Sequence, residues 1–399
     1  MASVISASPR LLIVDDNTEN RDMLRRRLQR LGYAELEEAV DGLDALERLR
    51  ALAAAGETVD VILLDVMMPR MNGIALLEHL AADPVLSHSA VLMISADTEV
   101  DTVVRCIELG AEDYLPKPFN PTILRARLGS ILEKRRLRAE IDRQYRRIEK
   151  ELSEAREQQL SMLPDTFPDG GPEHAVSIHA VMQPAREVGG DFYDSFAVGP
   201  GAVCVAVGDV SDKGVPAALF MARTRSLLRA GVLQCFEAAG TVPAPAHLAR
   251  LMNDELCRNN PACMFVTLIF GFLDLGSGRM TCVNAGHLRP WIIDRVGQPR
   301  EISLPPDPPM GIMPQTDYRD HVLDLGLGET FVAVTDGLTE MADPGGALYT
   351  AGRVGEDLAD IAHWKPVEMV AELARRVQHF AGSAPVADDV TALVLRRLR

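Results

Sequence analysis

The stretch CVAVGDVSDKGVPAALFMA (Cys204–Ala222) carries an acidic turn between two apolar segments. Its first four residues are all apolar, as in a buried strand, and the segment after Gly214 has the length and composition of a buried helix. The turn holds Asp209 at the strand end and a second carboxylate, Asp212, three residues later. Acids at the end of a buried strand repel one another, so this region depends on what compensates their charge.

Three further runs place acids beside glycine or a turn. They contain Asp191 and Asp194 (VGGDFYD), Asp336 (VTDG), and Asp388 and Asp389 (ADDVT). At the strand ends of a sandwich these acids can converge on one point, where a multivalent cation would offset their repulsion. Because the set is rich in carboxylates and poor in histidine, it favours Mg²⁺ or Mn²⁺ over Zn²⁺. Turn stabilisation explains any one of these acids, but not four such runs together.

A pair of such ions suits phosphoryl chemistry. Two ions about 3.5–4 Å apart can share a carboxylate, activate a bridging water and hold a phosphoryl group for in-line attack. Gly208 lets the backbone lie close to the ions, and the carbonyl of Val210 is a further candidate ligand. The acidic runs therefore predict a two-metal site in this part of the chain.

The surrounding segment, residues 165–399, begins within the turn-rich boundary LPDTFPDGGPEH (163–174). Strand-like runs then follow at 175–183, 202–209, 265–274, 279–287, 291–294, 321–325, 331–337 and 388–396, with helices near 214–234, 245–258 and 365–381. Gly-containing separators such as LGSG (275–278) suit hairpins. Many close strands with few helices predict an α+β domain of two packed antiparallel sheets flanked by helices.

These motifs resemble the metal-dependent protein phosphatases of type 2C (PPM family), in the SpoIIE/RsbU-like branch of sporulation and stress regulators. The matching motifs are PAREVGGDFYD, GDVSDKGVPAALFMA, FVTLIFGFLD, VNAGH, VTDGLTE and DDVTALVLR, in family order over about residues 160–399. The resemblance implies that Asp209 bridges two Mn²⁺ or Mg²⁺ ions. It implies that Asp336 and Asp388 complete the ligands of one ion and that Asp191 holds the water shell of the other.

For each of three residues in this segment, two interpretations remain open. Arg186 matches a family position that contacts substrate phosphate, but its motif is less specific. His287, in VNAGH, is either a general acid or a structural residue. Many relatives have Gly where this chain has Asp212, so that carboxylate either binds metal or faces solvent.

Residues 1–121 alternate short apolar runs with helical segments. The runs are 11–16, 35–39, 59–65, 90–95 and 113–116, with helices near 18–31 and 41–54 among the segments between them. This alternation predicts a doubly wound α/β domain with a five-stranded parallel sheet. Functional residues of such sheets gather beyond the carboxyl ends of the strands. Here those positions hold Asp15, Asp16, Asp65, Ser95 and Lys117.

Three facing carboxylates would repel unless a hard cation joins them, and Mg²⁺ suits an all-oxygen site. A carboxylate can also accept a phosphoryl group as a nucleophile. Lys117 would then neutralise phosphoryl oxygens, and the Ser95 hydroxyl would donate to one of them. Helix capping explains one or two of the acids, but not the strand-end Lys117 before Pro118 as well.

The signatures VDD, LLDVMMPRMNG, ISA and YLPKPF resemble a response-regulator receiver domain over residues 10–122. The resemblance implies that Asp65 is the phosphoacceptor. Asp16 and Asp65 would bind Mg²⁺ directly, with Asp15 assisting and the Met67 carbonyl completing the protein ligands. Ser95 and Tyr114 would form the switch pair, and the Lys117–Pro118 bond would be cis.

Residues 122–164 form a charged connector without an internal proline. Its positions Ile141, Tyr145, Ile148, Leu152, Ala155, Gln159 and Met162 repeat every four and three residues, which is a heptad seam. A single solvated helix would fit this composition, but the seam favours a parallel coiled coil and hence a homodimer. Acidic residues interleave with the basic ones, which argues against a nucleic-acid arm.

The whole chain has 399 residues and a net charge of −16, which disfavours general nucleic-acid binding. Its six cysteines show no CxxC pair, as expected for reduced thiols in an intracellular protein. No signal peptide and no apolar run of about 18 residues is evident, so we expect a soluble, cytoplasmic protein without membrane contact.

Together these features predict a two-component response regulator whose output is a metal-dependent serine/threonine phosphatase. A sensor histidine kinase would phosphorylate Asp65. By family analogy alone, the substrate would be a phosphorylated anti-sigma factor antagonist of a partner-switching pathway. The alternative is a non-catalytic scaffold that binds its partner in a phosphorylation-dependent way. A vestigial site would have lost at least one of Asp191, Asp209, Asp336 and Asp388, and all four are present.

Overall fold

The computed structural model describes residues 8–96, 100–169 and 175–398. The chain divides into two compact units, Met1–Ile148 and Glu149–Arg399. The border falls within a single helix, α5 (Pro121–Met162), which occupies most of the predicted connector. Among the described residues, no helix combines the length and apolarity that crossing a membrane requires.

The first unit is built on one parallel sheet in the order β2-β1-β3-β4-β5, as the alternating pattern predicted. Its strands are β1 (Leu11–Val14), β2 (Leu36–Ala39), β3 (Val61–Leu64), β4 (Ala90–Ser95) and β5 (Asp113–Pro116). Its helices are α1 (Thr18–Arg30), α2 (Gly42–Ala54), α3 (Gly73–Ala82), the short η1 (Leu86–His88), α4 (Val100–Glu108) and the first part of α5.

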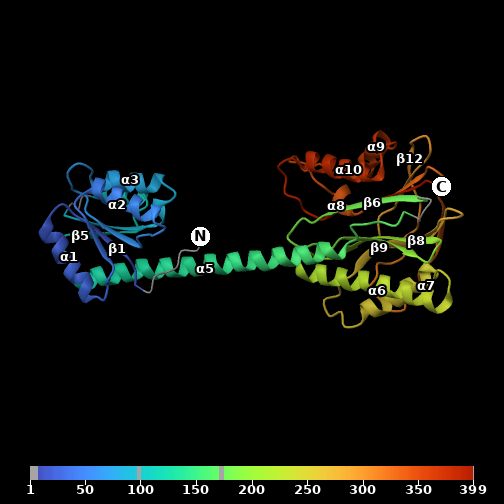
Figure 1. The fold of residues 1–399 in the computed structure, drawn as a ribbon, viewed down its shortest axis with the longest axis horizontal. Helices are drawn as coiled ribbons and strands as arrows, with labels where there is room; N and C mark the ends of the chain where they lie inside the picture. The colour runs from blue at the N-terminus through green and yellow to red at the C-terminus, as the bar shows by residue number, and fades with distance from the viewer. Residues whose placement is uncertain (1–7, 97–99, 170–174, 399) are drawn as a thin grey trace. The chain divides into compact units, whose positions relative to one another are not determined.

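Helices cover both faces of this sheet (Figure 1). On one face, Leu24 and Leu28 of α1 pack with Leu124 and Leu128 of α5. On the other face, α2, α3 and α4 contribute the buried side chains. Strands β1, β3 and β4 are buried along their whole length, which explains their continuous apolar sequences. Because the strands are parallel, their carboxyl ends share one edge, and that edge carries the predicted phosphoacceptor site.

The second unit contains two antiparallel five-stranded sheets, as predicted. One has the order β13-β10-β9-β8-β7 and the other β12-β11-β14-β15-β6. The strands are β6 (Val176–Gln183), β7 (Phe192–Val198), β8 (Ala202–Val210), β9 (Val266–Asp274), β10 (Arg279–Ala285), β11 (Trp291–Ile293), β12 (Pro299–Glu301), β13 (His321–Asp324), β14 (Thr330–Val334) and β15 (Val390–Arg397). The helices are α6 (Val215–Ala239), α7 (Pro245–Cys257), α8 (Asp336–Thr339), α9 (Thr350–Asp360) and α10 (Pro366–Ala381).

The two sheets stack face to face, with α6 and α7 outside one sheet and α9 and α10 outside the other (Figure 1). The largest buried cluster of the unit includes Val205 and Ile269 from one sheet and Phe331 and Leu393 from the other. A second cluster joins α8, α9 and α10 to the outer face of their sheet. Burial of these apolar surfaces is the main force that holds the four layers together.

The structure adds elements that the sequence patterns did not predict, namely β7, β12, α8 and α9. It confirms the hairpin at Leu275–Gly278, which joins β9 to β10 and has Gly278 at a positive φ of 75°. All six cysteines are free, as expected for reduced thiols.

Candidate metal centres

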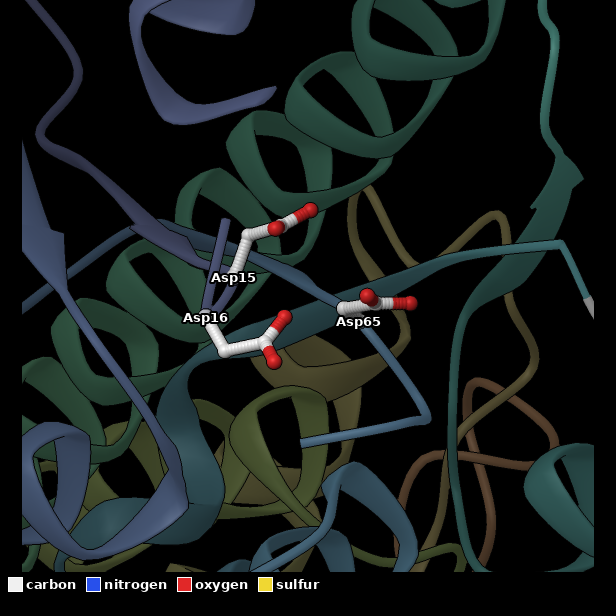
Figure 2. A group of neighbouring side chains, drawn as sticks. All are labelled: Asp15, Asp16 and Asp65. Atoms are coloured by element: carbon white, nitrogen blue, oxygen red, sulfur yellow. The ribbon is translucent and has the colours of Figure 1, made fainter. Parts of the chain in front are cut away.

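The first acidic centre lies at the carboxyl ends of β1 and β3. Figure 2 shows Asp15, Asp16 and Asp65 grouped there, and one ligand oxygen from each lies within 4.8 Å of the others. Asp15 and Asp65 are buried, whereas Asp16 is exposed. The donor set is three carboxylates at a partly open edge, which fits one hard divalent cation such as Mg²⁺.

Lys117 provides this centre with a cation of its own. Its Nζ lies 2.7 Å from Asp15 Oδ2 and 3.0 Å from Asp65 Oδ2. Burial lowers the pKa of Lys117, but its hydrogen bonds to Asp15 and Asp65 outweigh that effect and raise it. Burial raises the pKa of the Asp65 carboxyl, although Lys117 opposes the shift. The arrangement leaves Asp65 between an ammonium group and two acids, where an added phosphoryl group would find a counter-charge.

The remaining predicted receiver residues surround this edge. Ser95 is fully buried at the end of β4, and its carbonyl accepts a 2.7 Å hydrogen bond from the Lys117 amide. Tyr114, on β5, is 9% exposed and packs in the core with Cys106. The Lys117–Pro118 peptide is cis, as the resemblance implied. The Met67 side chain is 68% exposed, and its role as a carbonyl ligand stays a prediction.

The second acidic centre lies where β8, β14 and β15 of the second unit begin or end. Asp191 is 1% exposed, and its Oδ2 accepts a 2.7 Å hydrogen bond from Thr335 Oγ1. Burial and the charge of Asp209 raise the pKa of Asp191 well above its usual range. Burial, with the charges of Asp336 and Asp388, raises the pKa of Asp209 to about 7. These shifts mean that the two carboxylates face one another without sufficient compensation.

Asp336 and Asp388 form the outer part of this centre. Burial and the charge of Asp388 raise the pKa of Asp336. Asp388 pairs with Lys213, whose Nζ lies 2.8 Å from Asp388 Oδ2 and also donates to the Ala387 carbonyl. The four acids are electrostatically coupled, but they are less compact than the receiver triad. That triad is the one group of three within 4.8 Å among the described residues. Two-metal ligation by the four acids therefore stays a prediction.

Asp389, the neighbour of Asp388, organises the loop that carries Asp191. Its carboxylate accepts hydrogen bonds from the backbone amides of Ala185 (2.7 Å), Gly190 (2.7 Å) and Asp191 (3.3 Å). A Cβ on Gly190 would lie 2.8 Å from the Val210 carbonyl, the predicted extra ligand. Glycine is therefore needed at Gly190 for the loop to approach β8. The pattern ADDVT drew attention to both acids, but it did not reveal this division of roles.

The end of α5 contacts the same loop. Gln159 is 5% exposed, its Nε2 donates to the Gly189 carbonyl (2.6 Å), and its Oε1 accepts from the Gly189 amide (3.0 Å). The heptad pattern placed Gln159 in the dimer seam, but its side chain is instead used within the second unit. A polar residue at a core position of a heptad was the signal that could have indicated this contact.

Several sequence predictions need correction or refinement. A Cβ on Gly208 would lie 2.5 Å from the Phe192 ring, so core packing also requires glycine there, and the approach of its backbone to metal stays a prediction. Asp194 is fully buried in ion pairs with Arg225 and Arg229, apart from the metal ligands. Asp212 is exposed with a φ of 68°, the left-handed conformation that explains glycine in relatives.

His287 is buried, whereas Arg186 is exposed. His287 is buried with Nδ1 2.9 Å from Thr267 Oγ1, and burial lowers its pKa to about 4. An imidazole with that pKa is neutral at pH 7, which favours the structural interpretation over the general acid. Arg186 is exposed on the loop before Asp191, and its carbonyl accepts from Arg156 Nη1 at 3.4 Å.

The fold and these sites identify the class of protein. Residues 11–129 match the family model of the response regulator receiver domain, and residues 199–398 match that of Stage II sporulation protein E. The second match covers half of the chain, and the protein therefore belongs to the Stage II sporulation protein E (SpoIIE) family of PPM-type phosphatase domains, with a receiver domain at its N-terminal side.

Individual relatives match one part of the chain or the other. Protein IcfG of Synechocystis sp. is 30% identical over 269 residues, which are 62% of this chain but 41% of IcfG, so the chain spans less than half of that relative. Chemotaxis protein CheY-3 of Vibrio cholerae is 34% identical over 134 residues, 34% of this chain and 99% of CheY-3. The SiaA-PP2C domain of Pseudomonas aeruginosa shares the phosphatase fold, with a TM-score of 0.54 and 22% identity over 63% of this chain and 98% of that domain.

The receiver centre is expected to accept a phosphoryl group on Asp65 from a small phosphodonor. Incubation with acetyl phosphate and Mg²⁺ should place one phosphoryl group on Asp65, because its carboxylate is flanked by Lys117 and the other two acids. Asp65→Ala should abolish the mass increase that intact-protein mass spectrometry detects. Asp60→Ala, on an acid at the opposite end of β3, is the matched control and should retain it. Equal labelling of the Asp65→Ala protein would contradict the assignment.

Proposed function

We propose that the protein hydrolyses phosphoserine or phosphothreonine on a partner protein, with two Mn²⁺ or Mg²⁺ ions, under control of Asp65 phosphorylation. The observation that carries this proposal is the pair formed by the buried Asp191 and the half-buried Asp209. Within the described parts of the chain, neither acid has an ion pair with lysine or arginine, and the pKa of Asp209 rises to about 7. Such a pair fits bound divalent cations and has no other evident compensation.

Each residue of the centre then has a specific task. Asp209 would be shared by the two ions. Asp336 and Asp388 would help to hold one of them, and Asp191 with the Val210 carbonyl would help to hold the other. When bound, the ions would supply Lewis-acid stabilisation and a nucleophilic water. Thr335 holds Asp191 in one orientation through its 2.7 Å hydrogen bond. Arg186 is exposed on the neighbouring loop, and we assign it the task of orienting the substrate phosphate.

The substrate and partners rest on family resemblance. In this account a sensor histidine kinase phosphorylates Asp65, and the phosphatase acts on a phosphorylated anti-sigma factor antagonist. The scaffold alternative predicts binding without turnover. The presence of all four acids, in positions where their charges couple, supports the enzyme.

Helix α5 is the continuous element through which control would pass. Along its seam, Ile141, Tyr145 and Ile148 are 63%, 66% and 56% exposed in the single chain, which supports pairing with a second copy. A change in this pairing would move the end of α5, where Gln159 holds Gly189. We therefore infer that phosphorylation acts by setting the position of the loop that carries Asp191, and that it activates hydrolysis.

The test of the enzyme is metal-dependent release of phosphate. The purified protein should hydrolyse p-nitrophenyl phosphate and a phosphoserine protein in the presence of Mn²⁺. Asp209→Asn removes the bridging charge and should lower kcat by at least about a hundredfold while circular dichroism stays unchanged. Asp212→Asn, three residues away and exposed, is the matched control. Full activity in excess chelator, or in folded Asp209→Asn protein, would exclude the two-metal mechanism.

The relay is tested at Gln159. Gln159→Leu removes two hydrogen bonds to Gly189, each worth about 1 kcal/mol, so the affinity for Mn²⁺ should fall by up to about thirtyfold. Stimulation by acetyl phosphate should be lost in the same protein. The neighbouring Gln158 is exposed, and Gln158→Leu should behave like the unmodified protein. Normal stimulation of Gln159→Leu would refute a relay through this contact.

A further inference from the structure

A cavity of about 540 Å³ opens beside the phosphatase acids, entirely within residues 149–399. Most of its lining residues are apolar, among them Met182, Met341, Val377 and Val390, and Gln183 and Gln378 add polar groups. Val386, 45% exposed, lies at its mouth, and Arg156 of α5 forms part of its wall. The volume lies in the range of pockets that take small ligands or single side chains.

The cavity and the acidic centre share their supporting segments. Met341 follows α8, the helix that begins with Asp336. Val386 and Val390 lie on either side of Asp388 and Asp389 in the chain. Pro184, which also lines the cavity, precedes Ala185, whose amide donates to Asp389. The segments that line the cavity therefore adjoin those of the acidic centre in the chain, although none of the four acids lines the cavity itself.

The charge at the rim points to the kind of occupant. Arg156, which lines the cavity, donates to the backbone carbonyl of Arg186 at 3.4 Å, and this contact places the Arg156 guanidinium group at the cavity edge. Neither has a carboxylate ion pair in the described structure, although the chain as a whole has a net charge of −16. A cavity with one guanidinium group among mostly apolar lining residues is complementary to an apolar side chain that lies next to negative charge.

We propose that this cavity binds an apolar side chain that neighbours the phosphorylated residue of the protein substrate, with Arg156 and Arg186 facing the phosphate and its acidic surroundings. The inference rests on the proposed phosphatase function and adds a specificity pocket to it. Because Arg156 belongs to α5, three residues before Gln159, correct docking of that helix also completes the substrate site. The connector would thus control both the loop with Asp191 and the recognition of the substrate.

Phosphopeptides test the pocket with the full-length protein. The probes are phosphoserine peptides that are identical except for leucine or glycine at the positions flanking the phosphoserine. The reference substrate is p-nitrophenyl phosphate, which has no flanking residues. Burial of leucine in the cavity should raise kcat/KM at least about tenfold over the glycine peptide at one flanking position.

Ala384→Trp fills the cavity from a partly exposed part of its wall. In this variant the ratio of kcat/KM for the leucine peptide to that for the glycine peptide should fall to about one. Val386→Asp, at the mouth, should produce the same loss and serves if the tryptophan variant does not fold. Val296→Trp, on a turn where Val296 is 73% exposed, is the matched control and should keep the leucine preference.

The outcomes separate the pocket from the phosphatase itself. Equal rates on the leucine and glycine peptides, or a leucine preference that survives both cavity variants, overturn the pocket while the enzyme stands. Such a result would assign the cavity to another occupant, such as a second copy of the chain. Failure to hydrolyse even p-nitrophenyl phosphate with Mn²⁺ would overturn the proposed function, and the pocket would fall with it.

Discussion

The Asp389 carboxylate, which accepts three backbone hydrogen bonds from one loop, is the interaction on which the phosphatase site depends. It fixes Ala185, Gly190 and Asp191 at the start of β15 and so keeps Asp191 buried beside Asp209. Two carboxylates would not stay together in a buried position unless the backbone around them were restrained. Gly189 belongs to the same loop, and its carbonyl accepts a hydrogen bond from Gln159 of α5. One side chain therefore connects ligand placement to the helix that leads from the receiver.

The two acidic centres differ in how the repulsion between their carboxylates is offset. In the receiver, Lys117 lies within 3.0 Å of both Asp15 and Asp65, so the protein carries part of the counter-charge itself. In the phosphatase, Lys213 pairs with the peripheral Asp388, and Asp191 and Asp209 share no such partner in the described residues. The receiver centre thus has a fixed cation beside Asp65, whereas Asp191 and Asp209 of the second centre have no such cation among the described residues.

Much of the architecture followed from local pattern, because continuous apolar runs and helical periodicity report burial directly. Strand β7 was not predicted, because Asp194 interrupts its apolar pattern, and it is the ion pairs with Arg225 and Arg229 that allow this acid to be buried. The receiver triad was predictable because strand ends in a parallel sheet share one edge. The contacts of Gln159 and Gly208 were not predictable, because each depends on a partner distant in sequence. Gln159 bonds to Gly189, and Gly208 packs against the Phe192 ring.

The central claim is that phosphorylation of Asp65 acts on the loop of residues 184–191 through α5. Amide hydrogen exchange of this loop, measured on the full-length protein with Mg²⁺ and with or without acetyl phosphate, tests it most directly. The amides of Gly189 and Gly190 are hydrogen-bonded to Gln159 and Asp389, so a shift of the helix must alter their protection. We predict a several-fold change that is absent in Asp65→Ala. Stimulated phosphatase activity with unchanged exchange across residues 184–191 would contradict the account.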